Sequence, residues 1–203
     1  MAERKDSAER ILEGLKDIYS WSKKEILTDC PVRHIHRKME LSKRLVTEEE
    51  KQWCENKIKE LEEQVPDPNF ADPEEYRKKK SRYDSIKNRN TRVLNKYEDQ
   101  KTDKTLELTV HAVQIGEVAF ASNRFELYQD FMHRIQARSP FIQTFVVQLA
   151  GFDGATYLPT ERGVANKGYS ASLFCNVVGP EGGQQLVEGT LEMLNELKAQ
   201  NEQ

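Results

Sequence analysis

The stretch LELTVHAVQIGEVAFAS, residues Leu106–Ser122, decides the fold. Apolar residues alternate with polar ones over 106–112, which is the two-residue period of a strand with one buried face. Ile115-Gly116 then predicts a turn, and residues 117–122 are expected to return as a second strand. A β-sheet therefore begins near the middle of the chain.

Helical periodicity dominates the chain before this sheet. Apolar residues recur at helical spacing from Asp6 to about Ile26, which predicts an amphipathic helix. The segment PVRHIHRKMEL, residues 31–41, has extended character instead. Two more helices are expected, from about 48 to 64 and from about 72 to 98, and together they form a charged helical hairpin over about 47–99.

Capping signals mark the ends of the hairpin helices. Thr47 and Glu50 stand in capping-box register, and Asp72 is followed by Pro73 at the first helical position. Glutamates and lysines three and four residues apart favour solvated helix faces. A partner-binding coiled coil is the alternative, although Pro66 interrupts any sustained heptad.

The segments after the second strand complete the expected fold. Residues 124–138 predict a helix, and FIQTFVVQLA, residues 141–150, is a nearly continuous apolar run typical of a central strand covered on both faces. Residues 168–178 are expected to add an extended segment, and GPEGG, residues 179–183, to begin the last helix. The predicted fold class is α+β, a layered α/β arrangement in which a mixed β-sheet packs with helices.

Composition excludes several classes of protein. The chain of 203 residues suits a single domain, 1–203, and 37% hydrophobic residues suffice for a core. A net charge of −3 and a pI near 5.9 give no general electrostatic reason to bind nucleic acid. Three widely spaced cysteines indicate neither a disulfide framework nor a cysteine zinc site, so a reducing, cytoplasmic setting is expected. No apolar run approaches the roughly 18 residues of a transmembrane segment.

The common catalytic motifs GxSxG, Walker A and GxGxxG after a strand are absent. His34 and His36 form an HxH spacing that can place two imidazoles on one side of a strand facing a metal, but without a third ligand nearby a partly exposed surface pair is expected. His111 and His133 are expected to be isolated. GPEGG before a helix either holds an anion on free backbone amides or only makes a tight turn.

Four blocks of sequence, read in order, carry a resemblance to a known family. They are GEVAFASNRFELYQDF, ARSPFIQTFVVQLAGFDGATYLPTERG, GYSA and GPEGGQQLVEGTLEML. They resemble the carboxyl-terminal half of the catalytic domain of neutral/alkaline (non-lysosomal) ceramidases, and more closely its shorter bacterial relatives of unassigned substrate. The resemblance is firm over about 106–197 and extends, through the hairpin and the leading strand, to about residue 9.

The resemblance implies a zinc-dependent amidase that hydrolyses an N-acyl bond such as that of ceramide. In the family, two histidines, a glutamate and a tyrosine hold the zinc. Glu126 stands at the place of the ligand glutamate, with Arg124-Phe125 in place of the family's Pro-Gly pair. Tyr157 in TYLPT matches the ligand tyrosine, with Thr156 in place of a glycine, and Tyr169 in KGYSA matches a second tyrosine that helps to polarise the scissile carbonyl.

These three residues would divide the chemistry between them. A phenol near a dication can ionise below its usual pKa of ~10 and bind the metal, and Glu126 would add an anionic oxygen. The phenol of Tyr169 can donate a hydrogen bond to a developing oxyanion. The alternative is structural: tyrosines beside turns often only cover a core edge, and a glutamate at a helix start often only faces the helix dipole.

The family's histidine ligands and its serine-bearing substrate loop have no match in this chain. We therefore expect a hydrolase half-domain, inactive alone, that needs a missing N-terminal half or a second copy to bind zinc and an N-acyl or lipid substrate. This hypothesis predicts that Glu126, Tyr157 and Tyr169 converge at the carboxyl end of the FVVQL strand and that an apolar surface lies bare. The alternative is a non-catalytic interaction domain, with scattered tyrosines, a closed core and an apolar stripe along the hairpin.

Overall fold

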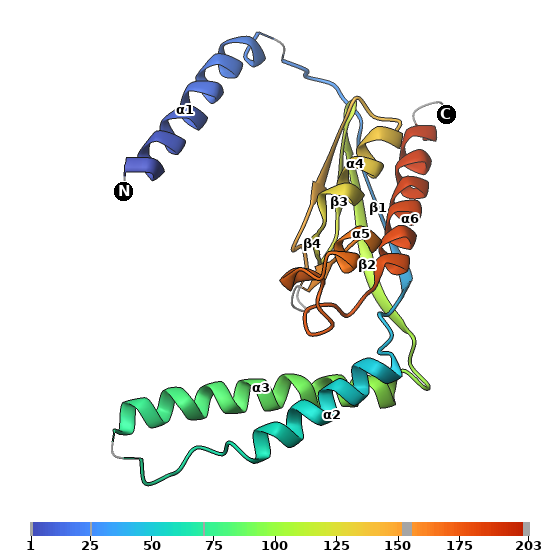
Figure 1. The fold of residues 1–203 in the computed structure, drawn as a ribbon. Coiled ribbons are helices and arrows are strands. Elements are labelled where there is room, and N and C mark those ends of the chain that lie inside the picture. Colours follow the sequence, from blue (N-terminus) through green and yellow to red (C-terminus); the bar gives the residue numbers. More distant parts are fainter. Residues whose placement is uncertain (1, 25, 71, 152–155, 201–203) are drawn as a thin grey trace.

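The helices and strands follow the order of an α+β fold (Figure 1). The computed structural model describes residues 2–24, 26–70, 72–151 and 156–200. In chain order the elements are α1 (Ala2–Ser22), β1 (Val32–Ser42), α2 (Glu48–Glu62), α3 (Pro73–Asp99), β2 (Thr105–Ile115), β3 (Val118–Ser122), β4 (Glu126–Leu127), α4 (Gln129–Arg138), β5 (Gln143–Val147), β6 (Tyr157–Leu158), α5 (Glu161–Ala165), the 3-10 helix η1 (Tyr169–Ala171) and α6 (Pro180–Ala199). The predicted fold class is confirmed.

The main sheet has the strand order β1-β2-β3-β5. β1 and β2 pair antiparallel over eleven residues each, β3 pairs antiparallel with β2, and β5 pairs parallel with β3. The prediction that 141–150 forms the central strand is wrong, because β5 lies at the edge of the sheet. Its apolar run is continuous for another reason: Phe145 and Val147 point to the uncovered face and remain half exposed.

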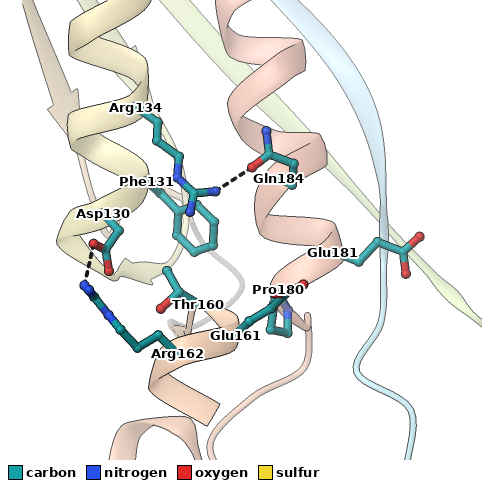
Figure 2. A pocket seen from close by; sticks show the side chains of 9 residues that line it. All are labelled: Asp130, Phe131, Arg134, Thr160, Glu161, Arg162, Pro180, Glu181 and Gln184. Atoms are coloured by element: carbon teal, nitrogen blue, oxygen red, sulfur yellow. Dashed lines mark hydrogen bonds and ion pairs between the residues drawn. The ribbon is translucent and has the colours of Figure 1, made fainter. Parts of the chain in front are cut away.

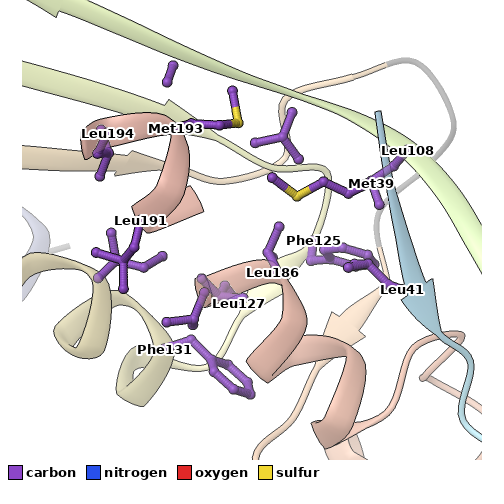
Figure 3. Close-up of a cluster of buried hydrophobic side chains, with 14 of the residues drawn as sticks. Met39, Leu41, Leu108, Phe125, Leu127, Phe131, Leu186, Leu191, Met193 and Leu194 are labelled. Atoms are coloured by element: carbon purple, nitrogen blue, oxygen red, sulfur yellow. The ribbon is translucent and has the colours of Figure 1, made fainter. Parts of the chain in front are cut away.

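The core lies on one side of this sheet, under α4 and α6 (Figures 1 and 3). Both helices contact the sheet, α6 through β1 and β2 and α4 through β5. The buried residues of the core come from the covered face of the strands and from the inner faces of both helices, and include Leu41, Val110, Ala112, Phe125, Phe131, Ile135, Leu186, Met193 and Leu194. This packing supplies the hydrophobic stabilisation of the fold.

The opposite face of the sheet is open, with no helix over it in the described part of the chain. Val113, Phe120 and Phe145 stand side by side across β2, β3 and β5, and the two phenylalanine rings stack with centroids 5.1 Å apart. Ile115 and Val147 are also between 40 and 50% exposed on these strands. Together these side chains leave a contiguous apolar surface on the open face.

The hairpin of α2 and α3 has the predicted boundaries. Thr47 makes both hydrogen bonds of the capping box with Glu50, and Asp72 accepts from the first turn of α3. Where the hairpin meets the body, Cys54 and Val93 are buried against Leu173 and Phe174. Burial raises the pKa of the Cys54 thiol to about 11, so this cysteine is a packing residue.

Helix α1 is amphipathic as predicted, but its apolar side is uncovered. The side chains on that face are at least half exposed: Ile11, Leu12, Leu15, Ile18 and Tyr19. In Figure 1 the helix stands clear of the sheet and of the hairpin. The exposed apolar stripe of this protein therefore lies on α1, whereas the interaction-domain hypothesis placed it on the hairpin. Among the described residues, no helix is both long and apolar enough to cross a membrane.

Two further segments differ from their predicted structure. The expected helix 124–138 begins only at Gln129, because the Asn123 side chain accepts from the Phe125 amide at 3.0 Å and turns the chain into β4. Residues 168–178 do not form an extended strand: η1 and a following turn, closed by the Cys175 amide on the Ser172 carbonyl, replace it. In both cases local hydrogen bonds outweigh the apolar pattern.

Candidate functional site

The candidate site is built on the two-stranded parallel pair of β4 and β6, just past the carboxyl ends of β3 and β5. The Asn123 amide donates to the Val147 carbonyl at 2.9 Å, and the Leu127 amide donates to the Gln148 side chain at 2.7 Å. These bonds hold β4 against the end of β5. Open α/β sheets commonly place ligand sites at the carboxyl ends of their strands.

Glu126 and Tyr157 lie side by side in this small sheet. They are register partners, so their side chains leave the pair on the same side. The Glu126 amide also donates to the Thr156 carbonyl at 3.0 Å, which fixes the two backbones together. A hydrogen bond to the Glu126 carboxylate raises the pKa of Tyr157, and the negative charge of Glu126 adds to the effect. The phenol therefore keeps its proton in the metal-free protein.

Tyr169 completes the group from η1. Its ring lies edge-on to that of Tyr157, with centroids 6.2 Å apart and ring planes at 75°. The side chain is 78% exposed, so it is open to a ligand. A hydrogen bond with the Cys175 side chain raises the pKa of Tyr169 and keeps its hydroxyl protonated, as a hydrogen-bond donor must be.

Two further residues organise the site, and the sequence offered no signal for either beyond their nearness to Tyr169. Cys175 contributes its side chain to Tyr169 and its carbonyl to the Tyr157 amide, at 3.2 Å. The buried Asn176 amide group donates to the carbonyls of Tyr157 at 3.0 Å and Ser170 at 2.8 Å. Asn176 thus joins the segments that carry the two tyrosines.

Replacing Asn176 with alanine is expected to lower the free energy of unfolding by about 1–3 kcal/mol, because two partly buried carbonyls lose their donor. Urea unfolding measures this loss. Asn195→Ala is the matched control, since Asn195 donates to the Leu191 carbonyl of its own helix at 2.8 Å and, among the described residues, joins no second segment. Equal losses in both variants would contradict the bridging role of Asn176.

Phe125 anchors the segment that carries Glu126. The ring is fully buried in the main core, and the residue directly precedes β4. The packing of this ring in the core fixes the position of the start of β4, as a tight turn of the backbone would also do.

The oxygens of Glu126 and Tyr157 fit two positions of a zinc site, since carboxylate and phenolate oxygens both bind this metal. A complete set is not present: among the described residues, no three His, Cys, Asp or Glu side chains form a group that could hold a metal ion. The side chains expected at the site are therefore brought together, without a complete set of metal ligands among the described residues.

The histidines are arranged differently from the prediction. His111 is not isolated, because it lies beside His34 and His36 on the open face of the sheet, with ring centroids 5.2 and 5.9 Å away. It is also the third histidine that the HxH pair lacks in the sequence. The prediction missed it because the pairing of β1 with β2 joins residues about 75 positions apart.

The GPEGG segment forms the first turn of α6, beside a hollow of about 540 Å³ between α4, α5 and α6 (Figure 2). The two arginines of this hollow are engaged, Arg134 with Gln184 at 2.7 Å and Arg162 with Asp130 at 2.9 Å. Glu161 and Glu181 also line it, so acidic groups outnumber basic ones and an anion is not favoured. The glycines serve close packing instead.

Comparison of the chain with protein-family models, with curated proteins and with solved structures finds no match. The site's geometry and chemistry alone therefore support the functional proposal.

Proposed function

We propose that this chain is one half of a zinc-dependent amide hydrolase of the ceramidase-like kind, acting on an N-acyl substrate. The observation that carries the proposal is the meeting of Glu126, Tyr157 and Tyr169 at one end of the sheet, although they come from β4, β6 and η1. A purely structural role for two tyrosines does not require a carboxylate beside one of them.

In this function each side chain would have one task. Glu126 and Tyr157 would hold the metal through two oxygens, and Tyr157 would release to solvent the proton that it shares with Glu126. Tyr169, which stays protonated, donates a hydrogen bond to the oxygen of the scissile carbonyl as negative charge develops there. Zinc, when bound, would lower the pKa of a coordinated water to about 7 and so supply the nucleophile.

The open face of the sheet supports the other part of the proposal, that a second half completes the enzyme. Phe120, Phe145 and Val147 leave apolar surface exposed on this face, which costs hydration free energy until another layer covers it. The second half would bring the nitrogen ligands of the metal. A homo-oligomer and a separate N-terminal segment are the two sources that we propose for it.

The alternative, a non-catalytic interaction domain that binds through the hairpin, has less support. The tyrosines are gathered rather than scattered, and Cys54 and Val93 of the hairpin are buried against the body. The charged faces of α2 and α3 are instead occupied by ion pairs within each helix, such as Lys57 with Glu60 and Lys79 with Glu75.

Zinc added to the purified chain together with imidazole, which stands in for missing nitrogen ligands, is expected to ionise Tyr157. The measurement is the near-ultraviolet difference spectrum of tyrosinate. We expect a signal of one tyrosinate per chain, and we expect Tyr157→Phe to lose it. In Glu126→Gln the zinc affinity that the signal reports should fall at least about tenfold, because one of the few ligands is removed. Tyr128→Phe is the control, as the Tyr128 hydroxyl is hydrogen-bonded to the Ser170 hydroxyl at 2.7 Å and not to Glu126 or Tyr157 among the described residues. A signal that persists in Tyr157→Phe would refute the metal role.

A further inference from the structure

The open face of the sheet carries three of the chain's four histidines. His36 is directly opposite His111 in the antiparallel pair of β1 and β2, and His34 lies two residues before His36 on the same strand. All three side chains therefore leave the sheet on the same side, and all three are exposed. The fourth, His133, lies on α4.

The separations within this group match those of imidazoles around one metal ion. The ring centroids are 5.2 Å apart for His34 and His111, 5.9 Å for His36 and His111, and 6.0 Å for His34 and His36. Zinc bound at 2.0–2.1 Å by three imidazoles in tetrahedral directions would place the centroids about 5 Å apart. The three rings are therefore within about 1 Å of the spacing that a shared ion requires.

In the metal-free arrangement a hydrogen bond joins two of the three rings. Nε2 of His34 and Nδ1 of His111 are 3.0 Å apart and share a hydrogen bond, so these two nitrogens already face each other. The rings do not yet converge on one point, in keeping with the absence of a formed metal group among the described residues. Since all three side chains are exposed, rotation about their side-chain bonds costs little and can redirect the nitrogens.

The surroundings of the trio favour a cation despite a neighbouring lysine. Lys38, next along the outward side of β1, is paired with Glu107 at 2.8 Å, so its charge is compensated. On the other flank the apolar side chains of Val113 and Phe120 lie on the same face. The long antiparallel pairing of β1 and β2 holds the three Cα positions, which leaves only side-chain rotation to be ordered on binding.

We propose that His34, His36 and His111 form a binding site for a divalent transition metal, zinc in particular, with water in the fourth position. Three neutral imidazoles suit zinc, nickel and copper, whereas magnesium and calcium prefer oxygen ligands. This site shares no residue with the site of Glu126 and Tyr157, and the proposal does not depend on the proposed hydrolase function. It would place a metal ion on the same open face that the second half of the enzyme is proposed to cover.

Isothermal titration of the metal-free chain with zinc alone tests this site. We expect about one equivalent bound in the wild type, an affinity at least about tenfold lower in His36→Ala and in His111→Ala, and none of this binding in the double variant. His133→Ala is the matched control, because it removes a histidine that lies on α4, and it is expected to bind zinc like the wild type. The imidazole nitrogen resonances of the three histidines should shift together on zinc binding.

Two results would overturn the site. One is a wild-type chain that binds no zinc, and the other is undiminished binding by the double variant. Because all three residues are exposed, their replacement should leave the circular dichroism spectrum unchanged, so loss of binding cannot be attributed to unfolding. The tyrosinate signal of Tyr157 distinguishes this site from the hydrolase site, since zinc held only by histidines does not ionise a tyrosine.

Discussion

Replacing Phe125 with alanine is expected to lower the free energy of unfolding by about 3–5 kcal/mol, through lost transfer free energy and the cavity left behind. The ring is fully buried in the main core. Its loss should also free the start of β4, which carries Glu126 in the next position. Chemical denaturation measures the first effect, and the zinc-induced tyrosinate signal measures the second.

Phe125→Leu is the matched variant for this prediction. It keeps an apolar side chain in the cavity, so we expect a loss of less than about half that of the alanine variant. If alanine cost no more than leucine, or if the tyrosinate signal survived unchanged in Phe125→Ala, then Phe125 would not anchor β4. The position of Glu126 would then need an explanation other than the packing of Phe125.

Gly182→Ala is expected to destabilise the protein by about 3 kcal/mol, near the upper end of the usual cost of overpacking. A Cβ at this position would lie 2.3 Å from Val178 Cγ1 and 2.6 Å from the Ser42 carbonyl oxygen. The second contact is with the backbone of β1, which cannot move without disturbing the sheet. The measurement is the shift of the urea midpoint.

Two other glycines serve as controls for Gly182. A Cβ on Gly189 would meet the flexible end of Met39, with Cε at 2.8 Å, so Gly189→Ala should cost less. A Cβ on Gly14 meets nothing within 4 Å, so Gly14→Ala should only favour the helical state of α1. The usual free-energy preference for alanine over glycine in a helix is about 1 kcal/mol. Equal effects at all three positions would contradict the close-packing role of GPEGG.

Both proposed metal sites depend on surfaces that this chain leaves open. The hydrolase site presents Tyr169 to solvent beside Tyr157, and the histidine site lies among the exposed residues of β1 and β2. In each case the ligands come from different strands or turns, so a metal would join elements that are otherwise connected only through the sheet. Variants of Glu126 and Tyr157 test the first site, and variants of His36 and His111 test the second. The set that loses zinc binding shows which site holds the metal.

The sequence alone determined the local elements of this protein. Thr47, Glu50, Asp72 and Pro73 predicted the boundaries of the hairpin helices because a cap is a contact between residues two or three positions apart. The alternation over 106–112 predicted β2 for the same reason, since one strand's period is a local property. The resemblance named Glu126, Tyr157 and Tyr169, which the structure places together.

Only the tertiary structure decided which elements became neighbours. It placed the apolar run of β5 at an edge with one face open, brought His111 beside the HxH pair, and joined Asn176 to the carbonyls of both tyrosine segments. The place of β5 and the contact of His111 have no local pattern, because each depends on which strands pair and in which register. The free energy that selects the pairing comes from burying α4 and α6 on one face of the whole sheet, a property of the assembled core and not of any single segment.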